Sequence, residues 1–138
     1  MQELDAFLDN WKDNDTKTKQ AFLELKDHIM AMEGITVEFT ARPGVSYSLR
    51  PCHKNQTERT LFAMADVIDD DPSERWLSVC FYGDMVTDPD EVGDLIPEGL
   101  LGDDGYCFDL DKYDKNSVNY IKERLNEAYR AANQTKAT

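Results

Sequence analysis

The spacing of apolar residues changes once, near residue 34, and this change limits the fold more than any other feature of the sequence. Before it, apolar residues recur at the i, i+3, i+4, i+7 spacing of an amphipathic helix, as in Leu4, Phe7, Leu8 and Trp11. A second stretch that favours helix covers residues 16–33. After it, apolar and polar residues alternate, which is typical of strands with one buried face. The pattern predicts two N-terminal helices followed by a sheet.

Runs of strand-forming residues separated by turn residues predict four consecutive strands, at 35–41, 45–50, 60–68 and 75–82. A fifth strand is predicted over 106–110, and a closing helix begins after the capping residue Asp114. Residues 133–138 are predicted to fray. Short turns favour antiparallel pairing, so we predict an α+β fold of two layers. Its sheet is an antiparallel meander of about five strands, with the N-terminal helices and the C-terminal helix packed on it.

The chain of 138 residues fits one domain, with no internal repeat and no linker. The helix within residues 1–13 is the part that reads as an addition to this domain. Its apolar stripe docks either on the domain itself or on a partner, and we favour docking on the domain because an exposed aromatic stripe promotes aggregation.

The cysteines and the N-terminal residues predict a cytoplasmic protein. Cys52, Cys80 and Cys107 are an odd number without CxxC spacing, which favours free thiols in a reducing compartment. The first residues are acidic where a signal peptide would be basic, and no run approaches the roughly 20 apolar residues of a membrane span. Cys52 and His53 are adjacent in an extended segment, so we do not expect them to form a catalytic pair.

Negative charge is concentrated in the second half of the chain. The formal net charge is −13, of which residues 1–60 contribute −2 (10 acids, 8 bases) and residues 61–138 contribute −11 (18 acids, 7 bases). Such a charge repels phosphate backbones and anionic lipids. We therefore expect neither direct nucleic-acid binding nor membrane binding.

The most acidic stretch is residues 83–104, called the acidic segment below, which has eight acids and no base. Its apolar residues show no clear periodicity, although a short helical turn could form at 91–96. Irregular segments of this length are often functional or mobile. We therefore predict an interaction surface made of Asp84, Asp88, Asp90, Glu91, Asp94, Asp103 and Asp104. We predict no metal site, because Val92 and Gly99 occupy ligand positions of the EF-hand-like spacing that begins at Asp88.

Positive charge is concentrated between residues 42 and 59, where Glu58 is the single acid. The candidate ligand-binding residues are Arg42, Arg50, His53, Lys54 and Arg59. Arginine side chains hold two oxygens of a phosphate or carboxylate at once, so this segment would suit a small anion or a nucleotide. The alternative, which we favour, is that these bases pair with the acidic segment across the surface.

Short strings between residues 36 and 129 resemble the small prokaryotic YjbR-like domains and allied α+β families of unknown function. They are Val45-Ser46-Tyr47-Ser48-Leu49-Arg50, Leu61-Phe62-Ala63-Met64, Leu110-Asp111-Lys112-Tyr113-Asp114 and Glu127-Ala128-Tyr129. The resemblance covers about two-thirds of the chain. It implies an α+β fold and supplies no catalytic residues.

The predicted function is a non-enzymatic interaction domain whose acidic segment binds a basic protein partner. A small-anion or nucleotide-binding domain that uses the segment from Arg42 to Arg59 is the alternative, and an enzyme of unknown reaction is third. The sequence has no P-loop, GxGxxG, GxSxG or HExxH motif, so it assigns no reaction and no cofactor. A homodimer is compatible with the sequence.

Overall fold

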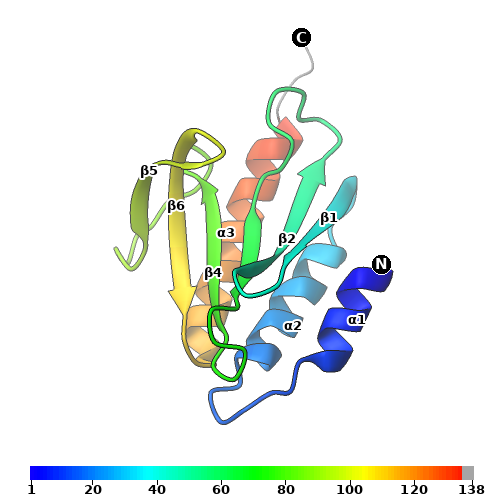
Figure 1. The fold of residues 1–138 in the computed structure, drawn as a ribbon. Coiled ribbons are helices and arrows are strands. Elements are labelled where there is room, and N and C mark those ends of the chain that lie inside the picture. Colours follow the sequence, from blue (N-terminus) through cyan, green and yellow to red (C-terminus); the bar gives the residue numbers. More distant parts are fainter. Residues whose placement is uncertain (135–138) are drawn as a thin grey trace.

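The computed structural model describes residues 1–134 and shows helices packed on one face of a curved sheet (Figure 1). The helices are α1 (Gln2–Asn10), α2 (Thr18–Met30) and α3 (Lys115–Gln134). The strands are β1 (Ile35–Arg42), β2 (Ser46–His53), β3 (Met64–Ile68), β4 (Trp76–Tyr82), β5 (Asp94–Leu100) and β6 (Asp103–Leu110). The predicted α+β class with an antiparallel sheet is confirmed.

The six strands form one antiparallel sheet in the order β1-β2-β3-β4-β6-β5. Strands β1 to β4 follow one another as a meander, and β6 then pairs with β4. As a result β5 lies outside β6, at the end of the sheet (Figure 1). The strand that the acidic segment contains is therefore an edge strand.

Alternation along the strands separates a buried face from a face without helices. Val79 of β4 lies opposite Ala65 of β3 and Phe108 of β6, and all three side chains are buried towards the helices. The helices contribute the other half of this core, with Phe22, Leu25, Ile29, Val118, Ile121, Leu125 and Ala128. The opposite face is uncovered by helices.

Helix α1 packs on the domain through Phe7 and through Trp11, the residue that directly follows the helix. Phe7 and Trp11 are buried, and the Phe7 ring stacks on Tyr47 with ring centroids 4.0 Å apart. Trp11 lies 5.9 Å from the Phe22 ring of α2. The guanidinium of Arg75 lies over the Phe7 ring at 5.0 Å. The apolar stripe of residues 1–13 is thus part of the main core.

Two local predictions are wrong. The acidic segment contains a sixth strand, β5, and the helical turn considered at 91–96 does not form because this strand begins at Asp94. The third strand begins at Met64, four residues later than predicted. Asn133 lies in α3, and its carbonyl accepts a hydrogen bond from the Asn55 side chain. Gln134 is the last residue of α3, and residues 135–138 of the predicted tail lie outside the described residues.

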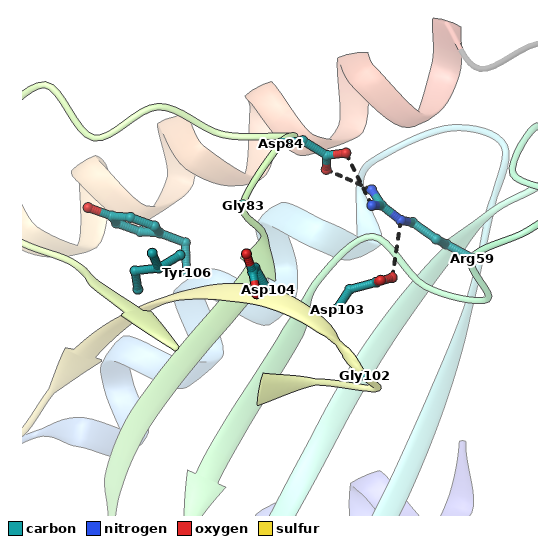
Figure 2. Close-up of a pocket in the computed structure, with 8 residues that line it drawn as sticks. Arg59, Gly83, Asp84, Gly102, Asp103, Asp104 and Tyr106 are labelled. Carbon is teal, nitrogen blue, oxygen red and sulfur yellow. Dashed lines mark hydrogen bonds and ion pairs between the residues drawn. The ribbon is translucent and has the colours of Figure 1, made fainter. Parts of the chain in front are cut away.

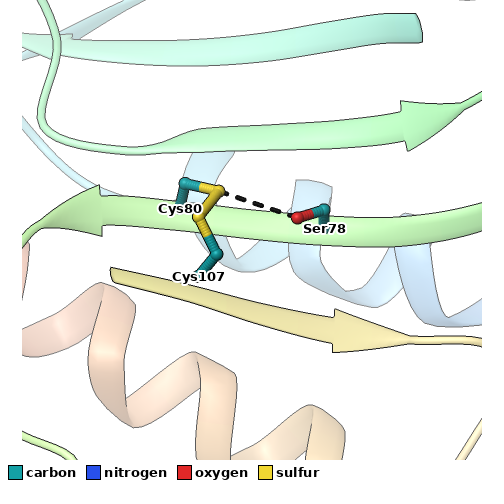
Figure 3. Close-up of a disulfide and its surroundings, with 3 residues drawn as sticks. All are labelled: Ser78, Cys80 and Cys107. Atoms are coloured by element: carbon teal, nitrogen blue, oxygen red, sulfur yellow. Dashed lines mark hydrogen bonds between the residues drawn. A yellow bond between two sulfur atoms is a disulfide. The ribbon is translucent and has the colours of Figure 1, made fainter. Parts of the chain in front are cut away.

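The prediction of three free thiols is wrong for Cys80 and Cys107, which form a disulfide (Figure 3). These two residues are direct partners in the pairing of β4 with β6, so the fold itself brings the thiols together. Their separation of 27 residues gave no CxxC signal in the sequence. Cys52 is free. The cysteines therefore no longer support the prediction of a reducing compartment.

Within residues 1–134, the structure contains no helix long and apolar enough to cross a membrane.

Candidate functional site

The acidic segment is attached to the rest of the fold at its start by an ion pair. Arg59, from the loop before β3, donates two hydrogen bonds to the carboxylate of Asp84, at 2.7 and 3.1 Å. Asp103 lies 3.8 Å from the same guanidinium, and Arg59 also stacks on the ring of Tyr82 at 4.0 Å. The hydrogen bond from Arg59 lowers the pKa of Asp84. Asp84 and Asp103 are therefore partly neutralised within the chain.

A second attachment joins the acidic segment to α3. The Thr87 hydroxyl donates to the Glu127 carboxylate at 2.6 Å, and the Thr87 backbone amide donates to the same carboxylate at 3.2 Å. The Glu127 carboxylate also forms an ion pair with the buried Arg124, with Oε1 2.6 Å from Nε. This chain of contacts holds the middle of the β4–β5 connection against the helix layer.

Asp88 organises the middle of the acidic segment by accepting four hydrogen bonds. Its Oδ1 accepts from the Tyr120 hydroxyl of α3 at 2.5 Å and from the Val92 amide at 3.1 Å. Its Oδ2 accepts from the Gly93 amide and from the Tyr106 hydroxyl, both at 2.9 Å. Desolvation alone would raise the pKa of Asp88, but the hydrogen bonds outweigh it and lower the pKa to about 2. This carboxylate is used within the fold rather than offered to a partner.

The replacement Asp88→Asn is expected to lower the free energy of unfolding by about 1 kcal/mol at pH 7. Because the folded-state pKa is about 2, below the ordinary value of 3.8, the carboxylate stabilises the fold above about pH 5. That contribution is lost as the pH falls from about 5 towards 2. Urea unfolding at pH 7 and pH 3 measures it, and the variant should show a smaller difference between the two pH values than the unchanged chain.

Asp90→Asn is the matched control, because it removes one acid two residues away whose side chain is exposed. Equal destabilisation of the two variants at pH 7 would contradict the structural role assigned to Asp88.

Gly93 fits the acidic segment against β6 because it has no side chain. A Cβ at this position would lie 2.5 Å from the Tyr106 ring and 2.7 Å from the Phe108 ring. The close approach places β5 beside β6 and brings the backbone amide of Gly93 to Asp88. Glycine is the residue that permits this approach.

Several acids of the segment remain exposed and without a cation. Among the residues that the structure describes, Asp90, Glu91, Asp94, Glu98 and Asp104 are exposed and take part in no ion pair. Asp104 nevertheless accepts a hydrogen bond from the backbone amide of Glu98. The unpaired charge of the acidic segment therefore lies mainly on β5 and on the residues just before it.

Large apolar side chains are exposed on the same stretch. They are Val92 (62% exposed), Leu95 (55%), Ile96 (43%) and Leu101 (61%). Six of the seven residues of β5 are exposed, so the strand has no buried face of its own. We call residues 90–101 the edge surface. It combines unpaired carboxylates with apolar side chains at the end of the sheet.

A hollow of about 600 Å³ adjoins the edge surface (Figure 2). Arg59 and Asp84 form one side of it, and Asp103 and Asp104 line it from the start of β6. Leu95 and Tyr106 supply apolar lining, and Figure 2 shows Tyr106 on the side away from Arg59. The lining carries more carboxylates than cations, which suits a positively charged group better than an anion.

The basic residues predicted as a ligand site do not form one group. Arg42 and Arg50 lie on the sheet face without helices, where they donate to Ser46 at 3.2 Å and to Ser48 at 2.9 Å. Asp66 lies next to Ser48 in the sheet register. Burial raises the pKa of Asp66, against the hydrogen bond from Ser48 and the charges of both arginines.

The other predicted basic residues lie elsewhere. His53 is buried on the opposite face of the sheet, with its ring centroid 5.2 Å from that of Tyr129. Burial and the charge of Lys54 lower the pKa of His53. Lys54 is exposed in the loop after β2. Arg59 pairs with the acidic segment, as the favoured reading of the sequence expected, and the hollow that it lines includes neither Arg42 nor Arg50.

Cys52 shows no sign of activation as a nucleophile. Its thiol is half-buried beside a small cluster of Leu61, Tyr82 and Leu100. Burial and the charge of Glu38 raise the pKa of Cys52, against the effect of Arg50. The neighbouring His53 side chain points to the other face of the sheet, because successive residues of a strand alternate.

The sequence did not identify the tyrosines and the apolar residues that complete the site. Tyr106 and Tyr120 bind Asp88 from β6 and α3, and no local motif links them. Apolar residues within an acid-rich, aperiodic segment were the available signal for the edge surface. Within residues 1–134, no group of three or more His, Cys, Asp or Glu side chains is placed to hold a metal ion.

Comparison of the chain with protein-family models, with curated proteins and with solved structures finds no match.

Proposed function

We propose that this chain is a non-enzymatic interaction domain that binds a basic protein through its edge surface. The observation that carries the proposal is the combination of unpaired acids with exposed apolar side chains over residues 90–101. Carboxylates alone are common on solvated surfaces, whereas four exposed large apolar side chains in one short stretch favour a contact with another molecule. The acids give that contact a preference for a positively charged partner.

The order of the acidic segment supports the proposal. Arg59 from the loop before β3, and Tyr120 and Glu127 from α3, hold the segment from two other parts of the chain, so its exposed residues are presented from a fixed backbone. A surface that is arranged before binding loses less conformational entropy when a partner binds.

Backbone conformation gives further support. Glu91, Glu98 and Leu101 have φ values of 56°, 56° and 52°, in the left-handed region that non-glycine residues rarely adopt. Such conformations cost about 1–3 kcal/mol each and gather at functional sites. Three of the four non-glycine residues with positive φ in the described chain lie in the edge surface.

The anion-binding alternative has weaker support. Arg59 is already bound to Asp84, and Arg42 and Arg50 lie around Asp66, whose carboxylate would repel an anion when ionised. A small-anion site would require these three arginines to meet in one cavity, and the hollow beside Arg59 is acidic.

Neutralising the edge surface tests the proposed function. The variant Asp90→Asn/Glu91→Gln/Asp94→Asn is expected to bind a basic probe protein, lysozyme, at least tenfold more weakly than the unchanged chain at about 50 mM salt. The physical reason is that the variant loses three unpaired carboxylates beside the apolar contact. At this salt concentration, salt only partly screens the attraction between these carboxylates and the charges of the probe protein. Isothermal titration calorimetry at several salt concentrations measures the affinity and its salt dependence.

Glu3→Gln/Asp5→Asn/Asp9→Asn is the matched control, because these three exposed acids lie on α1 and their loss changes the net charge equally. If both variants lose affinity to the same extent, binding follows net charge alone and the proposed function is wrong.

A further inference from the structure

The two edges of the sheet differ in how they are protected. At one edge, α1 packs against β1, with the Phe7 ring 5.8 Å from the Phe39 ring. The exposed residues of β1 are Thr36, Glu38, Ala41 and Arg42, which include charges of both signs. Charged side chains and covering elements are the usual means by which proteins prevent an edge strand from pairing with another chain.

Strand β5, at the other edge, lacks this cover. It pairs with β6 on one side only, and in Figure 1 it lies at the end of the sheet away from α1 and α2. Leu95 and Ile96 are exposed there, on opposite faces of the strand, since consecutive residues of a strand alternate. An outer side of this kind offers backbone N–H and C=O groups together with apolar side chains.

The regular part of β5 is short. The register with β6 is regular from Asp94 to Ile96, and it is irregular between Ile96 and Leu100. Pro97 has no backbone N–H and cannot donate to a neighbouring strand. An added strand would therefore pair over Asp94–Ile96, and side chains beyond this stretch would contribute the remaining contacts.

Charge selects the occupant of this edge. Asp90, Glu91, Asp94 and Glu98 lie on β5 or close to it, and the acidic segment contains no base. A second copy of the chain paired edge to edge would bring two such segments together and would be repelled. An extended segment in which Lys or Arg side chains alternate with apolar side chains matches this edge. Its apolar face would lie on the side of Leu95, and its basic face would lie on the side of Asp94 and Ile96.

We propose that an extended basic segment of the partner protein adds to the sheet beside β5, over Asp94–Ile96. In this mode the backbone hydrogen bonds of the added strand give affinity, and alternating side chains give specificity. The inference rests on the proposed function, since it specifies how the basic partner binds. It makes a separate claim, namely that the bound segment is a strand.

A pair of peptides tests this claim. The first has eight residues in which lysine alternates with valine. The second is identical but carries an N-methyl group on every peptide amide, so that no stretch of it can donate hydrogen bonds to a strand while its charge is unchanged. Hydrogen exchange of the full chain is followed by mass spectrometry in the presence of each peptide. We expect the unmodified peptide to slow exchange at residues 94–96 at least fivefold and the methylated peptide to leave it unchanged.

A variant pair controls for the apolar contact. Leu95→Ser/Ile96→Ser is expected to weaken binding of the unmodified peptide at least fivefold. Met30→Ser/Val45→Ser, at positions that are 42% and 53% exposed and distant from β5 in sequence, should leave it unchanged. The two variants remove apolar side chains of similar exposure.

The outcomes separate the two proposals. If the peptides bind equally and neither slows exchange at residues 94–96, strand addition is wrong. The proposed function then still stands if the variant neutralised at Asp90, Glu91 and Asp94 loses that binding. Protection at β1 instead of β5 would also overturn the inference. If neither peptide binds the unchanged chain and lysozyme binding is insensitive to the same neutralisation, both proposals fail.

Discussion

Trp11→Ala is expected to lower the free energy of unfolding by about 3–5 kcal/mol. The Trp11 side chain is 3% exposed and contacts the Phe7 and Phe22 rings, with centroids 5.4 and 5.9 Å away. Truncation would leave a cavity between α1 and α2 that the surrounding rings cannot fill. Urea unfolding followed by circular dichroism measures the loss.

Two further variants keep this prediction testable. Val45→Ala, at an exposed position in the β1–β2 turn, should change stability by less than about 0.5 kcal/mol. If Trp11→Ala does not fold, Trp11→Phe should fold with a smaller loss, because it keeps an aromatic ring in the site. A loss below about 1 kcal/mol for Trp11→Ala would mean that α1 contributes little to the domain, and its aromatic stripe would then be a candidate contact for a partner.

Loss of the Cys80–Cys107 disulfide is expected to lower the free energy of unfolding by about 3 kcal/mol. The bond closes a chain loop with a sequence separation of 27 residues, and it restricts the unfolded chain more than the folded one. The folded structure should survive, because β4 and β6 are already paired over six residue positions. Urea unfolding with and without a reducing agent, and of the variant Cys80→Ala/Cys107→Ala, measures the effect.

The controls for this prediction use the third cysteine and the redox state. Cys52→Ala should respond to the reducing agent as the unchanged chain does, because Cys52 is free. The double variant should not respond to it. A reducing agent that leaves the unfolding midpoint of the unchanged chain in place would contradict a stabilising disulfide.

The strands that the sequence predicted correctly are those with one buried face. In β1 and β2, residues such as Val37 and Leu49 alternate with polar residues because one face packs on the helices. Strand β5 was missed for the opposite reason. Six of the seven residues of β5 are exposed, so its sequence shows no alternation of buried and exposed positions. The strand also contains a proline and two acids, and these residue types are rare in strands, so propensity does not indicate a strand either.

The amino-acid composition identified the segment that contains the candidate site, but it did not reveal how the side chains of that segment are arranged. The absence of bases between residues 83 and 104 correctly marked a distinctive segment. The sequence could not show that Asp88 is used internally, because its partners Tyr106 and Tyr120 lie 18 and 32 residues away. Nor could it show that Arg42 and His53 occupy opposite faces of the sheet, which depends on the strand register.

The bond between Cys80 and Cys107 also determines what a break in the backbone would do. The residues between the two cysteines include the whole acidic segment and β5, so this part of the chain is a covalently closed loop. A protease that cut one peptide bond within this loop would produce two chains that remain joined through sulfur, each still holding one of the paired strands β4 and β6. After such a cut, the disulfide would keep both fragments, and with them the edge surface, in one covalent molecule. Only reduction of the disulfide would break this covalent link.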